Sequence, residues 1–329
     1  PAAFVGALFQ TYLYEGNGSN QTITNGIDLS NKGGLVWIKN RDDTENHGLV
    51  DTEVKGLLFS NLTNAANTNI THTFNSNGFT VGSSGSMNDS NDSHVSWTFR
   101  KQPKFFDIQT YTGNRQDTNS YQDITHNLGS TPGMILVKET SSADDWMVYH
   151  RSANSADGIV LKLNSTDAAS DGGNVIFDVS EINSSSFRVG NMNNVNANGV
   201  SYVAYIFAHN NDDGGFGAAG DQDIIKCGSY TGNGSTTGVF QDLGFEPQWI
   251  ISKNAGLTEP WVMLDNKRGV GGAASNDPRL VANGTNAEAG GEIMKFDATG
   301  FTPLTADDKI NGNNYTYVYM AIRRGGMQT

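Results

Sequence analysis

The 329-residue sequence is poor in features on which several protein classes depend. Its single cysteine, Cys227, excludes an intrachain disulfide framework and a zinc site built from several cysteines. We expect this side chain to be buried in a strand as a small apolar group. No run of about 18 apolar residues occurs, so no membrane-spanning helix is predicted. Ala2–Phe9 lacks the basic residues of a signal peptide, and a chain that opens on Pro1 indicates a processed start or a piece of a longer protein.

Positive charge is also scarce, with 21 Lys and Arg against 34 Asp and Glu and a net charge of −13. Affinity for nucleic acid comes mostly from Lys and Arg that neutralise phosphates, so no nucleic-acid partner is expected. Glycine is abundant (39 residues), and aromatic residues reach 10%. Disordered chains are poor in aromatic residues. This mixture therefore indicates many short strands, joined by turns in which Gly and Asn adopt positive φ.

Five landmarks recur in the same order three times along the chain. A turn preceded by an aromatic residue opens each copy, at Tyr14–Gly18, Tyr111–Asn114 and Tyr230–Gly234. A β-branched run that ends in lysine follows, at Leu35–Lys39, Met134–Lys138 and Trp249–Lys253. A shorter apolar run comes next, at His47–Asp51, Trp146–His150 and Trp261–Asp265. A Phe-centred strand follows, at Gly78–Gly82, Ser186–Gly190 and Gly300–Pro303. A closing strand completes each copy, at His94–Phe99, Tyr202–Phe207 and Tyr317–Ile322. Self-similarity of this kind indicates a tandem repeat.

Within each copy, alternating or β-branched runs are separated by clusters of Gly, Asn, Ser and Asp, as is typical of antiparallel sandwiches and barrels. We predict an all-β protein of three tandem antiparallel β-sandwich (jelly-roll-like) domains, each with about seven to nine strands and one modest core. The predicted domains are residues 1–103, 104–209 and 224–329, with a flexible Gly/Asp-rich linker at 210–223.

Two local patterns carry their own predictions. The apolar spacing within Asp51–Asn67 is near-helical, but Gly56 and the Asn-rich tail limit it to one or two helical turns. The recurring Gly-Asn-Gly turn predicts a β-hairpin, because Asn-Gly supplies the positive φ that a tight hairpin loop needs.

No arrangement of side chains indicates catalysis, and no cofactor is predicted. The acidic pairs lie in polar turns and are interpreted as solvated rather than as the paired carboxylates of a hydrolase, at Asp42–Asp43, Asp144–Asp145, Asp212–Asp213 and Asp307–Asp308. No nucleophile motif lies in a strand-turn-helix context, and the six histidines lack zinc-site spacing. Calcium stays an alternative, since Met87–Asp92 and Asp221–Asp223 offer oxygen ligands, although solvated turns are the favoured interpretation.

Sugar binding by a β-sandwich needs an exposed aromatic ring with polar groups nearby for the sugar hydroxyls. Two groups of residues are candidates for contact with a glycan or receptor, namely Trp146 with Tyr149, His150 and Arg151, and Trp261 with Asp265, Lys267 and Arg268. The competing interpretation is that both tryptophans pack into their own sandwich cores.

Several strings resemble repeats in large virion structural proteins of marine tailed bacteriophages, including cyanophages, namely Tyr230–Ser235, Val36–Arg41, Phe74–Phe79 and Ala321–Gly325. The resemblance covers essentially the whole chain and is strongest in the first and third copies. The second copy departs from it, with Asn114-Arg-Gln in the turn and Glu139 after the lysine. The resemblance implies a location on the virion surface and a role as a tail-fibre-like component, without any residue-level site.

On this resemblance the leading hypothesis is a virion surface fibre, or a fibre-like appendage, that contributes to host attachment or glycan binding and is not an enzyme. The partners it implies are other virion proteins, further copies of the same chain (with a trimer favoured) and a host surface glycan or receptor. A capsid decoration protein, a virion-associated glycan-degrading enzyme and a bacterial adhesin are the alternatives.

Overall fold

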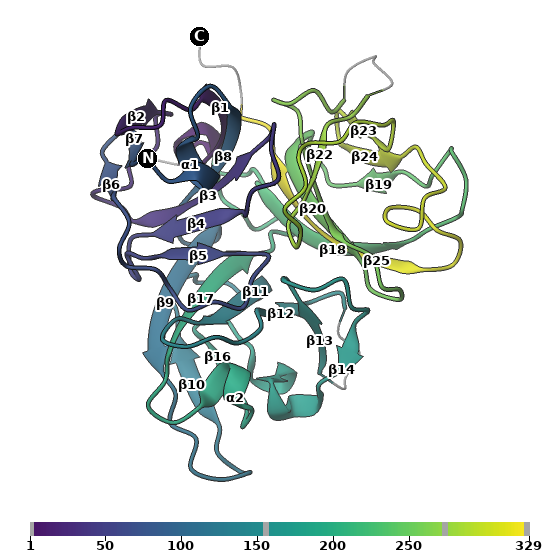
Figure 1. Cartoon of the computed structure of the whole chain (residues 1–329). Coiled ribbons are helices and arrows are strands. Elements are labelled where there is room, and N and C mark those ends of the chain that lie inside the picture. The colour runs from purple at the N-terminus through teal and green to yellow at the C-terminus, as the bar shows by residue number, and fades with distance from the viewer. Residues whose placement is uncertain (1–2, 154–157, 272–275, 326–329) are drawn as a thin grey trace.

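A computed structural model describes residues 3–153, 158–271 and 276–325. It is an all-β fold built from antiparallel sheets, as predicted (Figure 1). The strands form three successive sets, which we call repeat 1 (residues 9–100), repeat 2 (106–208) and repeat 3 (225–323). Each repeat pairs one large sheet with a small sheet of three strands. No helix in these ranges has the length or apolarity to cross a membrane.

Repeat 1 sets the pattern that the others follow. Its large sheet has the order β1-β8-β3-β4-β5 and its small sheet β2-β7-β6. The elements are η1 (Val5–Ala7), β1 (Phe9–Glu15), β2 (Gln21–Thr24), β3 (Gly34–Asn40), β4 (Gly48–Asp51), β5 (Leu57–Phe59), β6 (His72–Asn75), β7 (Gly78–Val81), α1 (Gly85–Asn88) and β8 (Ser93–Arg100).

Repeat 2 has the equivalent order β9-β17-β11-β12-β13, extended by β14, and a small sheet β10-β16-β15. Its elements are β9 (Phe106–Thr112), β10 (Gln122–Thr125), β11 (Pro132–Glu139), β12 (Met147–His150), β13 (Ile159–Lys162), β14 (Ser170–Asp171), η2 (Gly173–Val175), β15 (Phe177–Asp178), η3 (Val179–Glu181), β16 (Ser186–Val189), α2 (Asn193–Asn196) and β17 (Ser201–Ala208).

Repeat 3 returns to the order of repeat 1, with β18-β25-β20-β21-β22 in the large sheet and β19-β24-β23 in the small one. Its strands are β18 (Ile225–Thr231), β19 (Gln241–Asp242), β20 (Pro247–Asn254), β21 (Trp261–Asp265), β22 (Arg279–Val281), β23 (Met294–Asp297), β24 (Gly300–Pro303) and β25 (Thr316–Arg323). Cys227 is buried in β18, as predicted.

The central strands of the large sheets are buried on both faces. Every residue of β3, β11 and β20 is buried. In β3, Val36 and Ile38 pack into the core of their own sandwich. Leu35 and Trp37, which alternate with them, belong to a second core that runs through all three repeats. The expectation of one modest core per domain is therefore corrected, because the large sheets also share a central core.

The Gly-Asn-Gly turn is not a hairpin, which corrects the prediction. β1 pairs with β8 and β2 with β7, so the turn carries the chain from the large sheet to the small one. Its first glycine is required by a close backbone approach, since a Cβ at Gly16 would lie 2.0 Å from the Asp89 carbonyl oxygen. Buried Asn88 accepts a hydrogen bond from Asn17 N at 3.0 Å. Asn196 and Asn311 hold the equivalent turns in the same way.

Two further local predictions are corrected. The segment 210–223 is packed rather than flexible, because Asn210 donates to the Lys104 carbonyl at 2.9 Å and Phe216 enters the central core. The stretch after Asp51 forms a turn and then β5 instead of helical turns. The backbone groups of β5 form hydrogen bonds with β4 instead of the bonds within a helix, which a short segment interrupted by glycine stabilises poorly.

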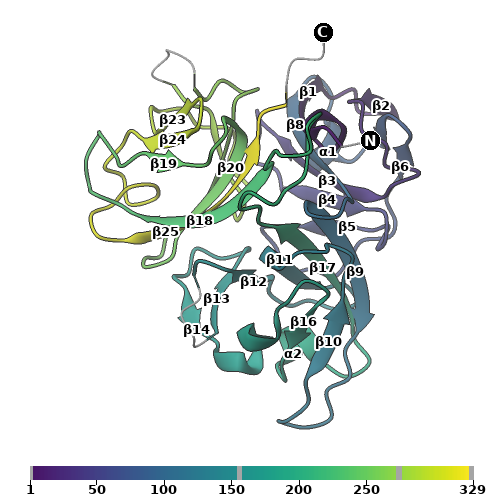
Figure 2. The ribbon, with the colours of Figure 1, turned by 180° about the vertical axis from the view of Figure 1, so that it is seen from behind.

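The three repeats close into a ring, visible as three lobes around a centre in Figures 1 and 2. Each junction carries the same backbone hydrogen bond, from Ala66 N to Thr140 O, from Ala169 N to Ala255 O, and from Glu288 N to Arg41 O. Repeat 1 thus contacts repeat 2, repeat 2 contacts repeat 3, and repeat 3 contacts repeat 1. Tyr205 adds a hydrogen bond of 2.7 Å across the first junction, to the carboxylate of Asp51.

Charged groups seal the junction between repeats 3 and 1. The buried guanidinium of Arg268 donates to Asp265 at 2.6 Å and to Glu288 at 3.1 Å, and lies over the Trp97 ring. Asp265 also accepts from the Trp97 indole at 3.1 Å. Arg41 of repeat 1 binds Glu288 through two hydrogen bonds of 2.8 and 2.9 Å. The first and last repeats are therefore joined by a satisfied ionic network.

We predict that Arg268→Met destabilises the chain by about 3–5 kcal/mol, because it leaves the Asp265 carboxylate buried without its counter-ion. Arg324→Met is the matched control, since it breaks an ion pair with Glu246 whose side chains are both more than a third exposed, and it should cost at most about 1 kcal/mol. Urea-induced unfolding measures both variants. Equal losses would contradict the assignment of Arg268 to ring closure.

Candidate functional site

The two tryptophans predicted to contact sugar are buried at junctions between repeats. Trp146 and Trp261 are 0% and 1% exposed. The Trp146 indole donates to the Phe59 carbonyl of repeat 1 at 2.9 Å. The Trp261 indole donates to the Lys162 carbonyl of repeat 2 at 2.8 Å. The expectation of an exposed aromatic platform is corrected. Both indole rings are buried, and both indole N–H groups are bound by carbonyl oxygens of a neighbouring repeat.

Repeat 1 has His47 at the position equivalent to these tryptophans. His47 faces the Val281 carbonyl of repeat 3, although its Nε2 makes no hydrogen bond among the described residues. It stacks on Trp97, with ring centroids 6.4 Å apart. Burial holds its pKa well below the ordinary range, so the ring stays neutral at the centre of the molecule.

The other predicted contact residues are divided between the interior and the surface. Tyr149 and His150 are buried, and His150 Nε2 lies 3.0 Å from the Tyr319 carbonyl oxygen across the junction of repeats 2 and 3. Burial lowers the pKa of His150 to about 4. Asp265 and Arg268 belong to the ionic network. Of the eight residues, Arg151 and Lys267 are exposed, and they lie in different repeats.

The acidic loops considered for calcium are held by protein donors. Asp223 accepts the backbone N–H groups of Asp212 and Gly214 at 2.8 and 3.0 Å. Asp92 accepts from the side chain of Asn40 at 2.7 Å. Among the described residues, no three His, Cys, Asp or Glu side chains gather as a metal-ligand set. Calcium at these loops stays an alternative to the favoured interpretation of solvated turns.

The lysine that ends each β-branched run is a buried structural group. Lys39, Lys138 and Lys253 are fully buried, and each ammonium donates to the carbonyl of the residue that follows it. Lys39 also reaches the Asp43 carbonyl at 3.0 Å, and Lys253 the Leu257 carbonyl at 3.2 Å. Burial lowers the pKa of all three to about 8. Lys39 and Lys253 therefore hold the loops that follow β3 and β20, whereas the equivalent lysine of repeat 2, Lys138, is bound at the end of β11 itself.

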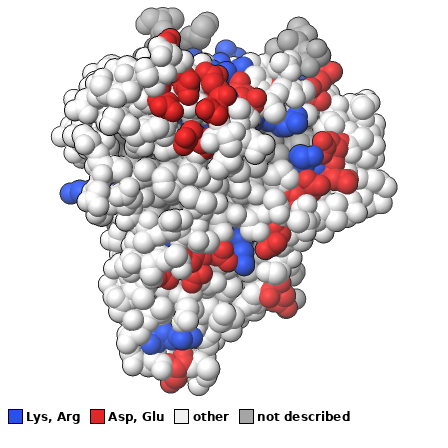
Figure 3. Space-filling view, in the orientation of Figure 1, with Lys and Arg blue, Asp and Glu red and all other residues white. Residues whose placement is uncertain are grey.

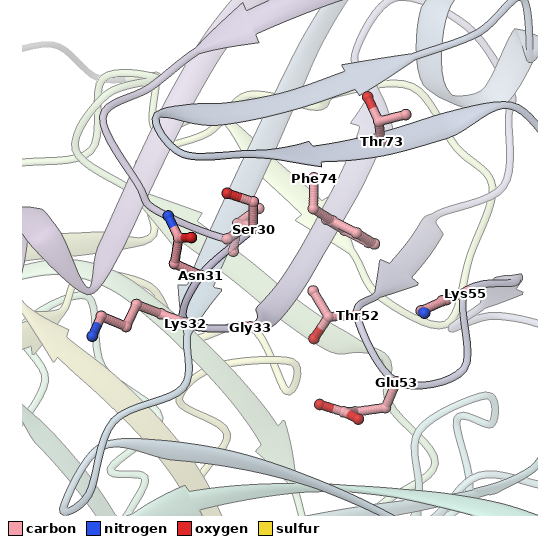
Figure 4. Close-up of a pocket in the computed structure, with 10 residues that line it drawn as sticks. Ser30, Asn31, Lys32, Gly33, Thr52, Glu53, Lys55, Thr73 and Phe74 are labelled. Carbon is pink, nitrogen blue, oxygen red and sulfur yellow. The ribbon is translucent and has the colours of Figure 1, made fainter.

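An open cavity of about 540 Å³ lies in repeat 1, between the small sheet and the turn that joins β4 to β5 (Figure 4). Phe74 of β6 points into it from the small sheet. Polar residues contribute most of the remaining lining, namely Ser30, Asn31, Lys32, Thr52, Glu53, Lys55 and Thr73. The cavity combines one aromatic face with a polar rim, which is the composition of a small-ligand site.

Hydrogen bonds fix both walls of this cavity. Asp51 Oδ1 accepts the backbone N–H groups of Glu53 and Val54, each at 2.8 Å, and so shapes the turn between β4 and β5. The second oxygen of the same carboxylate is held by Tyr205 of repeat 2. On the opposite wall, Asp28 accepts from Asn31 N at 3.1 Å. The wall of the cavity in repeat 1 is thus held in part by a contact with repeat 2.

In repeat 3 the equivalent space is filled. The connection from Asp265 to β22 is longer than that from Asp51 to β5, and its Val270 joins Phe296 in the sandwich core. Phe296 occupies the strand position of Phe74, since each pairs with the phenylalanine of the next strand. Phe296 is only 7% exposed. A short β4–β5 connection is what leaves Phe74 facing an open cavity.

Phe74, Lys32 and Lys55 were not predicted as site residues. Phe74 lies in a string that was noted only for its resemblance to virion proteins, Lys32 lies between two landmarks of the repeat, and Lys55 lies within the stretch expected to form one or two helical turns. The length of the connection after the third landmark could have indicated this site. The connection that follows His47–Asp51 is shorter than the equivalent connections that follow Trp146–His150 and Trp261–Asp265, so it leaves more space in its own repeat.

Comparison with known proteins identifies a family without an assigned activity. A family model described as "Domain of unknown function (DUF7483)" matches residues 5–324. No curated protein matches the chain. The crystal structure of the STIV MCP, a viral major capsid protein, superposes with a TM-score of 0.20 and 9% identity over 95% of each chain. A likeness this small bears on neither fold nor function.

We predict that the free energy of unfolding rises between about pH 7.5 and pH 9, by about 1 kcal/mol for each buried lysine. Their pKa of about 8 lies below the ordinary 10.5, so in this window the unfolded chain binds more protons than the folded one. At higher pH the rise should reverse, because burial raises the pKa of Cys227 and of tyrosines such as Tyr230.

Denaturant unfolding at several pH values measures this dependence. Lys138→Met should remove about a third of the rise, whatever its effect on absolute stability, since one of the three titrating groups is lost. Lys267→Met, at an exposed lysine, should leave the rise intact. An identical pH dependence in both variants would rule out the buried lysines as its source.

Proposed function

Because the chain belongs to the family of the domain of unknown function DUF7483, whose description carries no activity, we propose a function from its architecture and its sequence resemblance. The protein is a structural component of a phage virion surface, a fibre-like appendage that contributes to host attachment through glycan binding. It acts by binding, without catalysis. The observation that carries this proposal is the ring of three sandwiches joined through a common core.

A shared core supports a display role because it makes three β-domains one rigid body. The junctions use buried tryptophan, tyrosine and arginine side chains, so the repeats cannot move independently without exposing them. The ring holds the connecting loops in fixed relative positions. Rigid scaffolds that carry binding groups on their connections are a common solution in recognition proteins.

The surface is also compatible with recognition of a carbohydrate-rich partner. On the face shown in Figure 3, uncharged residues predominate, and acidic side chains gather in several groups with basic ones between them. Sugars present hydroxyl groups, and uncharged polar side chains such as Ser30, Asn31 and Thr52 of the cavity in repeat 1 can pair with them. The sequence resemblance supports a homotrimer, in which three chains raise the effective concentration of their sites at the cell surface. Sedimentation of the intact chain tests that assembly.

The experiment is to measure binding of the labelled, folded chain to candidate host cells, and its competition with phage adsorption. We expect saturable binding that reduces adsorption, because a host-attachment domain and the virion would occupy the same receptors. Absence of binding by the folded chain, together with binding to phage particles, would replace attachment by capsid decoration. Turnover of a host polysaccharide would overturn the non-enzymatic role.

A further inference from the structure

We propose that the open cavity of repeat 1 binds an acidic sugar unit of a polysaccharide, with the sugar ring against Phe74 and its carboxylate at Lys55. The inference rests on the proposed function and deepens it, since it names the site and the chemical class of the glycan. The cavity volume of about 540 Å³ is that of a small-ligand site.

The aromatic wall supplies the surface for the sugar ring. Phe74 is partly exposed and packs on one side against the sandwich core of repeat 1. Its other side faces the cavity, between Ser30 and Thr52 (Figure 4). The C–H face of a pyranose is apolar, so it can cover an aromatic ring while its hydroxyl groups stay directed toward the polar rim.

The charges of the rim select for an acidic sugar. Lys32 and Lys55 are exposed, and neither forms an ion pair within the described ranges. The one acidic side chain of the lining, Glu53, is bound by Lys101 at 3.1 Å. The two lysines lie on opposite sides of the cavity, and the Lys32 side chain extends away from Phe74 (Figure 4). Lys55 therefore supplies the local positive charge, on a chain of net charge −13. A carboxylate gains charge-assisted hydrogen bonds there that a neutral sugar cannot make.

The rim is also fixed before any ligand binds. Lys55 follows a turn shaped by Asp51, and its own backbone adopts a left-handed conformation with φ of 56°. Asn31 is held by two hydrogen bonds from its side chain to Asp28 and one from its backbone N. Preorganised walls reduce the ordering cost of binding, which matters for a weak ligand such as a single sugar unit.

The test is calorimetric titration of the intact chain with tetragalacturonate, a chain of four hexuronate units, and with neutral galactotetraose as the matched ligand. We expect binding of the acidic oligomer, weaker binding in high salt because exposed charges are screened, and little or no binding of the neutral oligomer. Phe74→Ala should weaken the affinity about tenfold. Lys55→Gln should weaken it and reduce its salt dependence.

Lys267→Gln is the matched control, an exposed lysine in the equivalent connection of repeat 3 that should bind as the unaltered chain does. Lys55→Gln keeps the test decisive if Phe74→Ala fails to fold, since Lys55 is exposed. Equal binding of both oligomers, or unchanged affinity in the Phe74 and Lys55 variants, would overturn the inference.

Cell binding separates this inference from the proposed function. If the intact chain binds host cells and both variants bind equally well, attachment stands and this site is wrong. If tetragalacturonate binds at Phe74 and no host cell is bound, the site stands and the attachment role falls.

Discussion

The architecture depends on one constraint, which is that the large sheet of each repeat must bury both of its faces. One face packs on the small sheet of the same repeat, and the other packs on the large sheets of its neighbours around the central core. A single repeat would leave the second face, with residues such as Trp37, Trp249 and Ile251, in contact with water. Burial of large aromatic side chains contributes several kcal/mol each, so the ring and the sandwiches stabilise each other.

Beyond the shared backbone hydrogen bond, and a tryptophan at two of the junctions, the side-chain contacts differ from one junction to the next. Tyr205 and Asp51 join repeats 1 and 2, and a tryptophan with a histidine joins repeats 2 and 3. The remaining junction carries Arg41, Glu288 and Arg268. A buried ionic network contributes less net stability than apolar packing, but it penalises any arrangement that leaves one charge unpaired. This difference favours a single order of the repeats around the ring.

The sequence was sufficient to predict the all-β class, the repeated pattern of strands and the burial of Cys227. It could not reveal the central core. A run such as Leu35–Lys39 indicates a strand buried on both faces, but that pattern does not say what covers the second face. For the same reason Trp146 and Trp261 were open to interpretation as surface groups. The prediction of a hairpin at the Gly-Asn-Gly turn was wrong because Asn-Gly is also suited to hairpins, whereas here Gly16 is needed for a close approach to the Asp89 backbone. Phe74 was not assigned, since its exposure depends on the length of the β4–β5 connection, and the sequence there was interpreted only as a candidate helical turn.

A closed ring also limits how such a protein can change in size. In an open array, a duplicated unit adds to the end and meets one neighbour, so copy number can drift over generations. Here every repeat already has two neighbours, and the angle between adjacent repeats is set by a core that accommodates three. A fourth copy would have to widen the ring and open its centre, or stay outside with one face unburied. Growth of this lineage should therefore proceed by lengthening loops or by multiplying whole three-repeat rings, and the number three should persist while the loops diverge.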